Sequence, residues 1–553
     1  MFLRRSHVLI VLFLSCVSLS ACRSNRREEI DAARRQSSSP AATGSAPATS
    51  ARPRAPEQTS VATPSAEASV ERIADDVEQD PSAAARWQTA ALARRTQPSD
   101  APRLYAKTRH VWIYADADST KQWIGFLWSG GSVKLRDTKP RYGLGCDQFY
   151  AVEPRGYICA DPRRVTTDPA DPVVAALYPY SPRADSPWPH RYGESRGTPI
   201  YFSLPDESEQ RNHEPDLRRQ LERIEAARAQ PVTDGPLVGV DLTPSPVQAL
   251  TFPRLAASVH EAHSMLKTRS TVAYSAEVRH AGRDFLLTSD YRFVPKDRVA
   301  PYPVSRFHGL RLGVDAQLPL AFFRTHAVPR YRRTESGEFV AQGSSFERLN
   351  HVELTGKSQR QLGKDYVETK TGDWIERALA VVPTTAEKTP WDAIVGKPDS
   401  SPIKPKGRAT WIEVSIRSGW LIAYEDTMPV FVTLISPGRG GEATAGRDPL
   451  ETSATPTGRF SITGKFLTST MVAPNDYFHS DVPYAQNFTG PYALHSAYWH
   501  DNWGNLMSGG CINLSPIDAE FMFRWTEPPA PPGWHGTRWL PYFEPATTLI
   551  IHR

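Results

Sequence analysis

The sequence predicts a mostly β protein with several domains. Short runs rich in aromatic and β-branched residues recur along the chain, such as HVWIYADAD from His110 and TWIEVSIRSGW from Thr410. Glycine, proline, serine and aspartate bound these runs, as turns between strands require. After residue 409 no helical pattern exceeds about three turns. The 49 prolines among 553 residues also favour extended connections.

The first 22 residues have the pattern of an export signal. Arg4 and Arg5 precede the apolar run 8–17, which is too short for a stable spanning helix. Leu-Ser-Ala at 19–21, directly before Cys22, resembles a bacterial lipobox, so we expect cleavage there and a lipid anchor on Cys22. An ordinary secretory signal is the alternative. By analogy with proteobacterial lipoprotein sorting, the absence of aspartate beside Cys22 favours the outer over the inner membrane.

Residues 23–100 are rich in Ser, Ala, Pro, Thr and Arg, as in SSSPAATGSAPATSARPRAP. Such a segment buries too little apolar surface to offset the entropy of ordering, so it predicts a disordered stalk. A short helical patch is compatible with residues 70–95. The net charge of +5 is spread without long basic blocks, which gives no indication of nucleic-acid binding.

Three β-rich segments follow, over residues 101–170, 171–310 and 311–387. The first ends FYAVEPRGYICADPRRV and the third ends DYVETKTGDWIERALAVV, each with a strand, a tight turn at Gly156 or Gly372, and a second strand. A weaker copy, RDFLLTSDYRFVPKDRV, lies in the middle segment, which also contains one exposed helix in EPDLRRQLERIEAARAQ.

These endings resemble those of bacterial SH3-like domains, which are common in cell-wall proteins. The self-similarity therefore predicts SH3-like small barrels in the first and third segments, and a weaker case for the middle one. Unrelated β-hairpins are the alternative. Residues 388–408 contain four prolines and predict a linker, followed by a mostly β domain over 409–553.

The five cysteines have different predicted fates. Cys16 lies in the signal and Cys22 receives the lipid, while Cys146 and Cys159 lie close together on neighbouring predicted strands. In an oxidising compartment this pair predicts a disulfide. Cys511 is then an unpaired thiol in an exported protein, and a reactive role would explain it.

The stretch LMSGGCINLSP surrounds Cys511. Ser515 and Pro516 predict a helix start, with Ile517, Phe521, Met522 and Trp525 on its apolar stripe. The amides of Gly510 and Cys511 are candidates for an oxyanion hole. A tight turn that needs glycine is the alternative.

His495 is the predicted base, because it ends the apolar strand in PYALHSAYW. The Ser496 carbonyl or hydroxyl is expected to fix its tautomer. His500 is expected to be exposed. A metal site of His479, Asp481, His495 and His500 matches no common zinc spacing, so we predict no metal and no organic cofactor.

In combination these features resemble the L,D-transpeptidase (YkuD-type) catalytic domain over residues 409–553. That family has a histidine-containing strand followed by [Ser/Thr]-His-Gly-Cys-x-[Asn/Arg]. The matching positions are His495, Ser508, Gly510, Cys511, Asn513 and Asp518-Ala519, with Thr455 to Gly458 at the hairpin entry. One departure is that Gly509 occupies the position of the family's motif histidine. The resemblance implies a YkuD-like mixed β-sandwich with short helices.

The resemblance also implies a reaction in the periplasmic cell envelope. Cys511 would attack a peptidoglycan tetrapeptide stem and expel D-alanine, with His495 as base and Ser496 as its orienting partner. The residues implied around the donor peptide are Gly509, Gly510, Ser508, Asn513, Tyr484, Phe488, Tyr498 and Trp499. For Phe488, packing in the core is an equal alternative. An amine acceptor would give a 3–3 cross-link or attach an envelope protein, and water would give a carboxypeptidase or amidase. The alternative is a non-catalytic lipoprotein that binds peptidoglycan.

Overall fold

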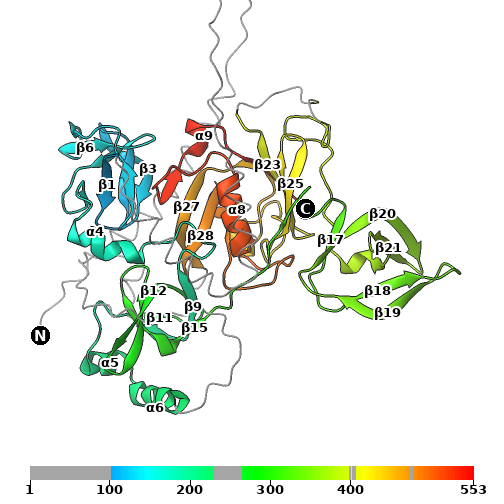
Figure 1. Cartoon of the computed structure of the whole chain (residues 1–553), viewed down its shortest axis with the longest axis horizontal. Helices are drawn as coiled ribbons and strands as arrows, with labels where there is room; N and C mark the ends of the chain where they lie inside the picture. The colour runs from blue at the N-terminus through cyan, green and yellow to red at the C-terminus, as the bar shows by residue number, and fades with distance from the viewer. Residues whose placement is uncertain (1–100, 229–264, 398–399, 401–406, 474–476) are drawn as a thin grey trace, which may run out of the picture. The chain divides into compact units, whose positions relative to one another are not determined.

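The computed structural model describes residues 101–228, 265–397, 400, 407–473 and 477–553. The predicted signal, lipobox and stalk of residues 1–100 lie outside these residues. Within the described part, no helix has the length and apolar character needed to cross a membrane. The described chain is mostly β with few, short helices, as the sequence predicts (Figure 1).

The first β-rich segment contains eight strands. They are β1 (Arg103–Ala106), β2 (Val111–Asp116), β3 (Ser119–Leu127), β4 (Ser132–Lys134), β5 (Arg141–Tyr142), β6 (Gln148–Ala151), β7 (Tyr157–Cys159) and β8 (Val165–Thr166). Strands β1, β4 and β8 form one sheet, and the others belong to a larger sheet. Alternate residues of β2, Val111 and Ile113, point into the local core, as expected of a half-buried strand.

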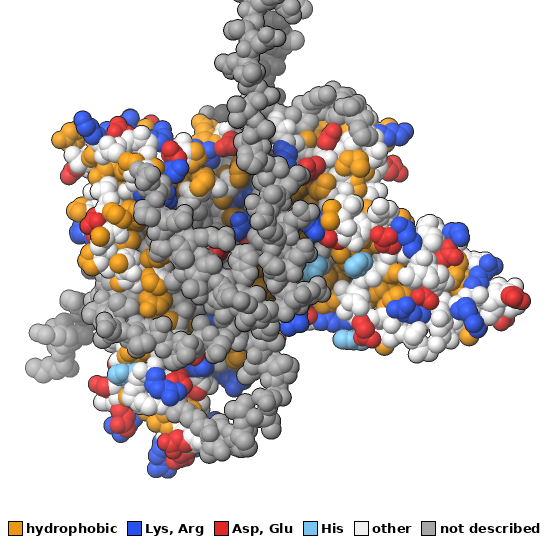
Figure 2. Space-filling view, viewed as in Figure 1, with side chains coloured by type: hydrophobic (Ala, Val, Ile, Leu, Met, Phe, Trp, Pro, Cys, Tyr) orange, Lys and Arg blue, Asp and Glu red, His pale blue; other side chains and the backbone are white. Residues whose placement is uncertain are grey.

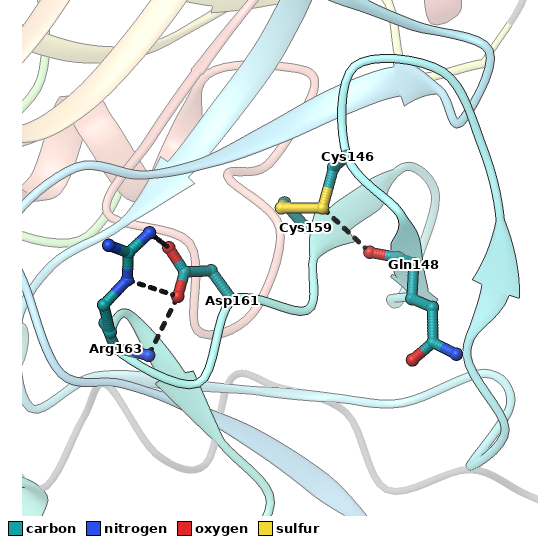
Figure 3. The surroundings of a disulfide bond; sticks show 5 residues. All are labelled: Cys146, Gln148, Cys159, Asp161 and Arg163. Atoms are coloured by element: carbon teal, nitrogen blue, oxygen red, sulfur yellow. Dashed lines mark hydrogen bonds and ion pairs between the residues drawn. A yellow bond between two sulfur atoms is a disulfide. The ribbon is translucent and has the colours of Figure 1, made fainter.

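A disulfide joins Cys146, in the loop before β6, to Cys159 at the end of β7, the pair that the cysteine spacing predicts. Their Cα atoms are 5.8 Å apart (Figure 3). In the following turn, Arg163 donates from Nε and Nη2 to the Asp161 carboxylate at 3.0 and 2.9 Å. The disulfide therefore fastens the hairpin on which the predicted repeat ends.

The middle segment combines helices with a five-stranded sheet. Its elements are α4 (Pro172–Leu177), η1 (Tyr178–Tyr180), β9 (Arg191–Ser195), β10 (Thr198–Pro199), α5 (Glu207–His213), α6 (Leu217–Arg228), β11 (Met265–Leu266), β12 (Thr271–His280), β13 (Arg283–Thr288), β14 (Phe293–Pro295), η2 (Lys296–Arg298) and β15 (Val299–Pro301). The sheet order is β14-β13-β12-β9-β15. Helix α6 is the helix predicted from EPDLRRQLERIEAARAQ.

The third segment forms a six-stranded sheet. Its elements are β16 (Leu310–Arg311), β17 (Leu320–Phe322), β18 (Val328–Arg333), β19 (Phe339–Phe346), β20 (His351–Gln361), β21 (Lys364–Thr369), β22 (Trp374–Glu376) and η3 (Arg377–Leu379). Strand β16 pairs elsewhere, with β25 of the next domain. Figure 2 shows basic and acidic side chains interspersed on the visible face of the part labelled β18–β21 in Figure 1.

The three predicted endings share one local arrangement. In each, a strand, a turn and a second strand lead to a short tight turn: residues 161–164 after β7, η2 after β14 and η3 after β22. Gly156 and Gly372 both have φ +89°, a left-handed conformation that suits glycine. The repeat is thus present in the backbone, and the identification of these segments as SH3-like barrels stays a prediction.

The C-terminal domain contains two sheets and one central helix. Its elements are β23 (Thr410–Ser415), β24 (Trp420–Glu425), β25 (Met428–Leu434), α7 (Pro449–Thr452), β26 (Gly458–Ser461), β27 (Gly464–Ala473), β28 (Tyr477–Thr489), β29 (Tyr492–Ser496), β30 (Ile512–Leu514), α8 (Pro516–Trp525), β31 (Gly536–Arg538), α9 (Leu540–Phe543) and β32 (Thr548–His552). One sheet has the order β16-β25-β24-β23-β32-β26, with β23 and β32 parallel. The other runs β30-β29-β28-β27-β31-β3-β2-β7-β6-β5.

The main core lies between these sheets. Ile412 and Leu421 of the first sheet, Leu494 and Ile512 of the second, and Met522 of α8 belong to one buried cluster. The opposite face of the first sheet is also covered: Trp411, Ile422 and Tyr424 pack with Phe307, Leu310 and Phe322 from upstream. Strand β23 is therefore buried on both faces, and its buried Glu413 accepts a hydrogen bond from the Tyr424 hydroxyl at 2.7 Å.

Two predictions need correction here. The segment 388–408 is not a free linker throughout, because Thr389 and Ala393 are buried and Trp391 packs against the core. Its residues 398–399 and 401–406 lie outside the described residues. In α8 the predicted stripe residue Met522 is buried, and Phe521 and Trp525 are half-buried but pack against the main core. The buried face also carries Asp518, Ala519 and Phe523, which the predicted stripe did not include.

Candidate active site

Cys511 lies at the end of a turn that leads directly into β30. The Ser508 hydroxyl donates to the Cys511 carbonyl at 2.5 Å and accepts the Gly510 N–H at 3.0 Å. Behind the strand, Ser515 accepts the Asp518 N–H at 3.1 Å and caps α8, whose first residue is Pro516, as predicted. The cysteine is thus held between a hydrogen-bonded turn and a docked helix.

Glycine is required at position 510. Its φ is +126°, and a Cβ there would lie 2.6 Å from Tyr492 Cε1 and 2.7 Å from the Ala454 carbonyl oxygen. The predicted turn role is therefore present. The predicted oxyanion role of the Gly510 amide is not met in this arrangement, because that amide already donates to Ser508.

Strand pairing brings His495 close to Cys511. Strands β29 and β30 are parallel, with His495 opposite Asn513 in the register. Cys511 directly precedes β30 and lies two residues before Asn513, which places it about 6–7 Å along the strand from the position opposite His495. The parallel pair thus unites two residues that are sixteen positions apart in the sequence.

His495 has the geometry of a neutral base. Its side chain is buried, and Nδ1 lies 2.8 Å from the Ser496 carbonyl oxygen. With Nδ1–H donating to that carbonyl, Nε2 keeps the lone pair that accepts a proton. Burial lowers the pKa of His495 to about 4, so the imidazole is neutral at pH 7. Of the two predicted acceptors, the carbonyl of Ser496 makes the contact.

Cys511 is a protonated thiol at rest. It is half-buried and unpaired, and its Sγ–H donates to the Pro491 carbonyl at 3.9 Å. Burial of the sulfur raises the pKa of Cys511 to about 11, while the backbone N–H of Ala493 opposes that rise. The site therefore holds a neutral thiol and a neutral imidazole, and ionisation needs proton transfer from one to the other.

Two further histidines surround this pair, and the sequence analysis did not assign them to the site. His479 stacks on Trp499 with ring centroids 4.0 Å apart, and Trp499 lies 5.9 Å from His495. His500 is half-buried rather than exposed, and burial lowers the pKa of both His479 and His500 to about 4. Burial is the main cause of these low pKa values, and repulsion by the neighbouring imidazolium forms lowers the pKa of His479 and His500 further.

Asn513 connects His500 to β30. Its Nδ2 lies 3.1 Å from His500 Nε2, and His500 Nδ1 accepts the Asn502 N–H at 3.2 Å. Neutral His500 then carries its proton on Nε2 and needs an acceptor there. Asn513 Oδ1 has no other partner, so the network favours the amide orientation in which that oxygen faces His500. Asn513 therefore orders the loop between His495 and Cys511.

The aromatic residues predicted to line a donor cleft have different positions. Tyr484 and Phe488 are buried in the main core, and the Tyr484 hydroxyl donates to the Ser186 carbonyl at 2.6 Å. Tyr498 is buried and stacks on Tyr192 at 3.8 Å. These three residues pack the interior. Trp499 is half-buried with its ring centroid 5.9 Å from that of His495, and its place in a donor cleft stays a prediction.

Gly509 is exposed, and a Cβ built on it would meet no atom within 4 Å. The position that departs from the family motif therefore has room for a side chain.

The four residues of the rejected metal set do not converge. Asp481 accepts from Thr468 Oγ1 at 3.1 Å and from Ser289 Oγ, on the side of the middle segment. Among the described residues, no three His, Cys, Asp or Glu side chains are arranged to hold a metal ion.

Comparison with known proteins gives one family and several solved structures. Residues 409–539 match the family model of the L,D-transpeptidase catalytic domain, YkuD. A mutant L,D-transpeptidase of Enterococcus faecium is 20% identical, with 26% of this chain and 50% of that chain covered and a TM-score of 0.19. The L,D-transpeptidase of Xylanimonas cellulosilytica is 18% identical, with 27% of this chain and 63% of that chain covered and a TM-score of 0.19.

L,D-transpeptidase 3 from Mycobacterium tuberculosis, solved with a faropenem-derived adduct, is 21% identical over 36% of this chain and 79% of that chain, with a TM-score of 0.20. The chain spans only half to two thirds of the Enterococcus and Xylanimonas structures. No curated protein matches the chain. The match of the family model coincides with the domain that carries Cys511 and His495, and residues 409–539 are an L,D-transpeptidase catalytic domain of the YkuD family.

Proposed function

We propose that this protein is a peptidoglycan L,D-transpeptidase that works through a thioester on Cys511. The observation that carries the proposal is the parallel pairing of β29 with β30, which brings His495 near Cys511, the residue directly before β30. An unpaired thiol beside a neutral imidazole with a free Nε2 is the arrangement that nucleophilic acyl transfer needs.

In the proposed reaction, His495 Nε2 accepts the Sγ proton while the sulfur attacks the carbonyl of the third stem residue. The tetrahedral intermediate collapses, the bond to D-alanine breaks, and the imidazolium returns its proton to the leaving amine. The Cys511 amide is the proposed oxyanion donor. An amine acceptor then gives a 3–3 cross-link or attaches an envelope protein, and water gives a carboxypeptidase or amidase.

The high pKa of Cys511 fits substrate-dependent activation. A neutral thiol and a neutral base avoid a buried charge pair at rest, and the proton moves when an acyl donor is in place. We place this reaction in the periplasmic cell envelope, with the protein anchored through Cys22, in the outer membrane by preference. No metal or organic cofactor takes part in the proposed chemistry.

The experiment is acylation by imipenem followed by intact mass measurement of the full chain. The proposal predicts one adduct per molecule on the native protein, none on Cys511→Ala, and slow formation on His495→Gln. The absence of an adduct on native protein, under conditions that acylate an active L,D-transpeptidase, would leave the non-catalytic peptidoglycan-binding alternative.

A further inference from the structure

Arg538, the last residue of β31, lies over two tryptophan rings. Its guanidinium carbon is 3.6 Å from the ring centroid of Trp123, on β3, and 5.3 Å from that of Trp539, which directly precedes α9. The Nε of Arg538 donates to the Trp123 carbonyl at 2.8 Å. These contacts hold the guanidinium in one orientation, and the first β-rich segment and the C-terminal domain provide them together.

The outer nitrogens of this guanidinium have no partner. Within the part of the chain that the structure describes, neither Nη1 nor Nη2 of Arg538 forms a hydrogen bond or an ion pair. Arg155 differs, because its guanidinium stacks on Phe543 but also pairs with Glu544 at 2.7 Å. Burial lowers the pKa of Arg538 to about 10, and no carboxylate opposes this effect. Arg538 is therefore a half-buried cation without a counter-ion, which an anionic ligand would stabilise.

The surface next to Arg538 is aromatic and exposed. Trp539 is 40% exposed, and Tyr542, whose N–H donates to the Trp539 carbonyl at 3.0 Å, is 81% exposed. Exposed rings beside a few fixed polar groups are typical of a binding site for an organic ligand. A planar guanidinium with two free nitrogens binds a carboxylate through two parallel hydrogen bonds. The arrangement thus fits a carboxylate that is attached to an apolar body.

Strand pairing places Arg538 on the same sheet face as His495. Arg538 pairs with Gly464 of β27, which pairs with Asn487 of β28. Asn487 in turn pairs with Ala493 of β29. Directly paired residues point to one face of a sheet, and Ala493 shares its face with His495 because the two lie two positions apart. Three strand spacings put Arg538 about 14 Å from Ala493.

Cys511 lies at the far end of this row. Its Sγ is 3.9 Å from the carbonyl oxygen of Pro491, two residues before Ala493. A peptide of four residues spans about 14 Å when extended, so a tetrapeptide stem that reaches Cys511 is long enough to reach Arg538. The surface at Arg538 is therefore outside the reacting centre but within reach of the same substrate.

We propose that Arg538, Trp123 and Trp539 form a binding site for a carboxylate group of a peptidoglycan stem, separate from the reacting centre. Nη1 and Nη2 of Arg538 donate to the two carboxylate oxygens, and the exposed ring of Trp539 contacts the apolar part of the same stem. No covalent bond forms or breaks at this site. The inference rests on the proposed function for the identity of the ligand, but it does not require acyl transfer.

The test is isothermal titration calorimetry of the full chain carrying Cys511→Ala, so that no acyl transfer consumes the ligand. The probes are a disaccharide-tetrapeptide and the same compound with its carboxylates converted to amides. Adding Arg538→Gln is expected to weaken binding of the carboxylate probe about tenfold, as loss of a charge-assisted bidentate pair predicts. The amide probe should bind more weakly than the carboxylate probe, and Arg538→Gln should weaken its binding no further.

Arg155→Gln is the matched control, because it removes a guanidinium that also stacks on an aromatic ring but already has Glu544 as its partner. It should leave the affinity for both probes unchanged. Arg538→Lys keeps the charge but loses the planar fork, so it should bind the carboxylate probe with intermediate affinity and replaces Arg538→Gln if that variant does not fold.

Unchanged binding of the carboxylate probe by a folded Arg538→Gln variant, or an equal loss of affinity for both probes, overturns the inference. Imipenem acylation of the native chain separates the two proposals. Binding through Arg538 in a chain that imipenem does not acylate supports the site and rejects the transpeptidase. Acylation of a chain in which Arg538→Gln binds both probes normally rejects the site alone.

Discussion

Gly509→His restores the histidine of the family motif and tests what its loss does. Gly509 does not have a left-handed φ, its side-chain direction is open, and the residue is exposed. The substitution should therefore fold without strain. An imidazole donor beside the developing oxyanion should speed acylation of Cys511, which has lost one predicted donor because the Gly510 amide is bonded to Ser508.

The size of the gain follows from exposure. A buried oxyanion donor is worth about 10²–10³ in rate. Water competes at an exposed position, so we expect a gain of about tenfold, or ~1.4 kcal/mol of transition-state stabilisation. The assay is the pseudo-first-order rate of imipenem acylation over a range of imipenem concentrations, with intact mass as readout.

Gly509→Gln is the matched control, because it adds a side chain of similar length without an imidazole. It should acylate at the native rate. Equal rates for Gly509→His and Gly509→Gln, or a slower histidine variant, would refute the interpretation of Gly509 as a lost oxyanion partner.

Three further changes test the surroundings. Gly510→Ala should cost about 2 kcal/mol of stability and slow acylation, because its Cβ would overlap Tyr492. A variant with the urea midpoint and the acylation rate of the native protein would contradict the packing described. Lys465→Met should lower the free energy of unfolding in urea by about 2–3 kcal/mol, because Lys465 Nζ donates to the carbonyls of Phe523 and Thr526 at the end of α8. An unchanged urea midpoint would contradict this role of Lys465. The pKa of His495 is lower in the folded chain than in the unfolded one, so stability should fall as pH drops from about 6.5 to about 4, by up to roughly 3 kcal/mol. His479 and His500 titrate in the same range, so His495→Gln should make that slope shallower without removing it, and an identical pH profile of urea midpoints would rule the effect out.

Local patterns predicted the individual elements of the C-terminal domain well. The alternation in TWIEVSIRSGW identified β23 and β24, and Ser515-Pro516 identified the start of α8. Both signals depend on residues adjacent in sequence, so a single sequence carries them. The disulfide between Cys146 and Cys159 was predictable for the same reason.

Long-range pairing could not be predicted. Strand β31 pairs with β3, more than 400 residues earlier, and β16 adds to the sheet of β25, so the catalytic domain shares its sheets with upstream segments. Two-residue strands such as β16 have no recognisable pattern. The sequence also did not predict that Phe307 and Phe322 cover the outer apolar face of the sheet that contains β23, because this contact joins segments far apart in the chain.

At the site, the sequence predicted the residues Cys511, His495 and Ser496 but not their environment. His500 was expected to be exposed, and its contact with Asn513 depends on a loop whose path has no sequence signature. Tyr484 was expected in a cleft because it is aromatic and near in sequence, yet its strand face places it in the core. Phe488 also lies in the core, which was the open alternative for that residue. An Arg, Lys or Asp at these positions would have indicated an exposed side chain, whereas aromatic residues occur both in buried cores and in binding clefts.

The central claim is that Cys511 forms a thioester with a peptidoglycan stem. The most direct measurement is the intact mass of the full chain during reaction with a disaccharide-tetrapeptide, with free D-alanine assayed in parallel. The account predicts an adduct of the disaccharide-tripeptide acyl group and one D-alanine released per adduct in native protein, with neither in Cys511→Ala. Native protein that binds the donor but forms no adduct and releases no D-alanine would contradict it.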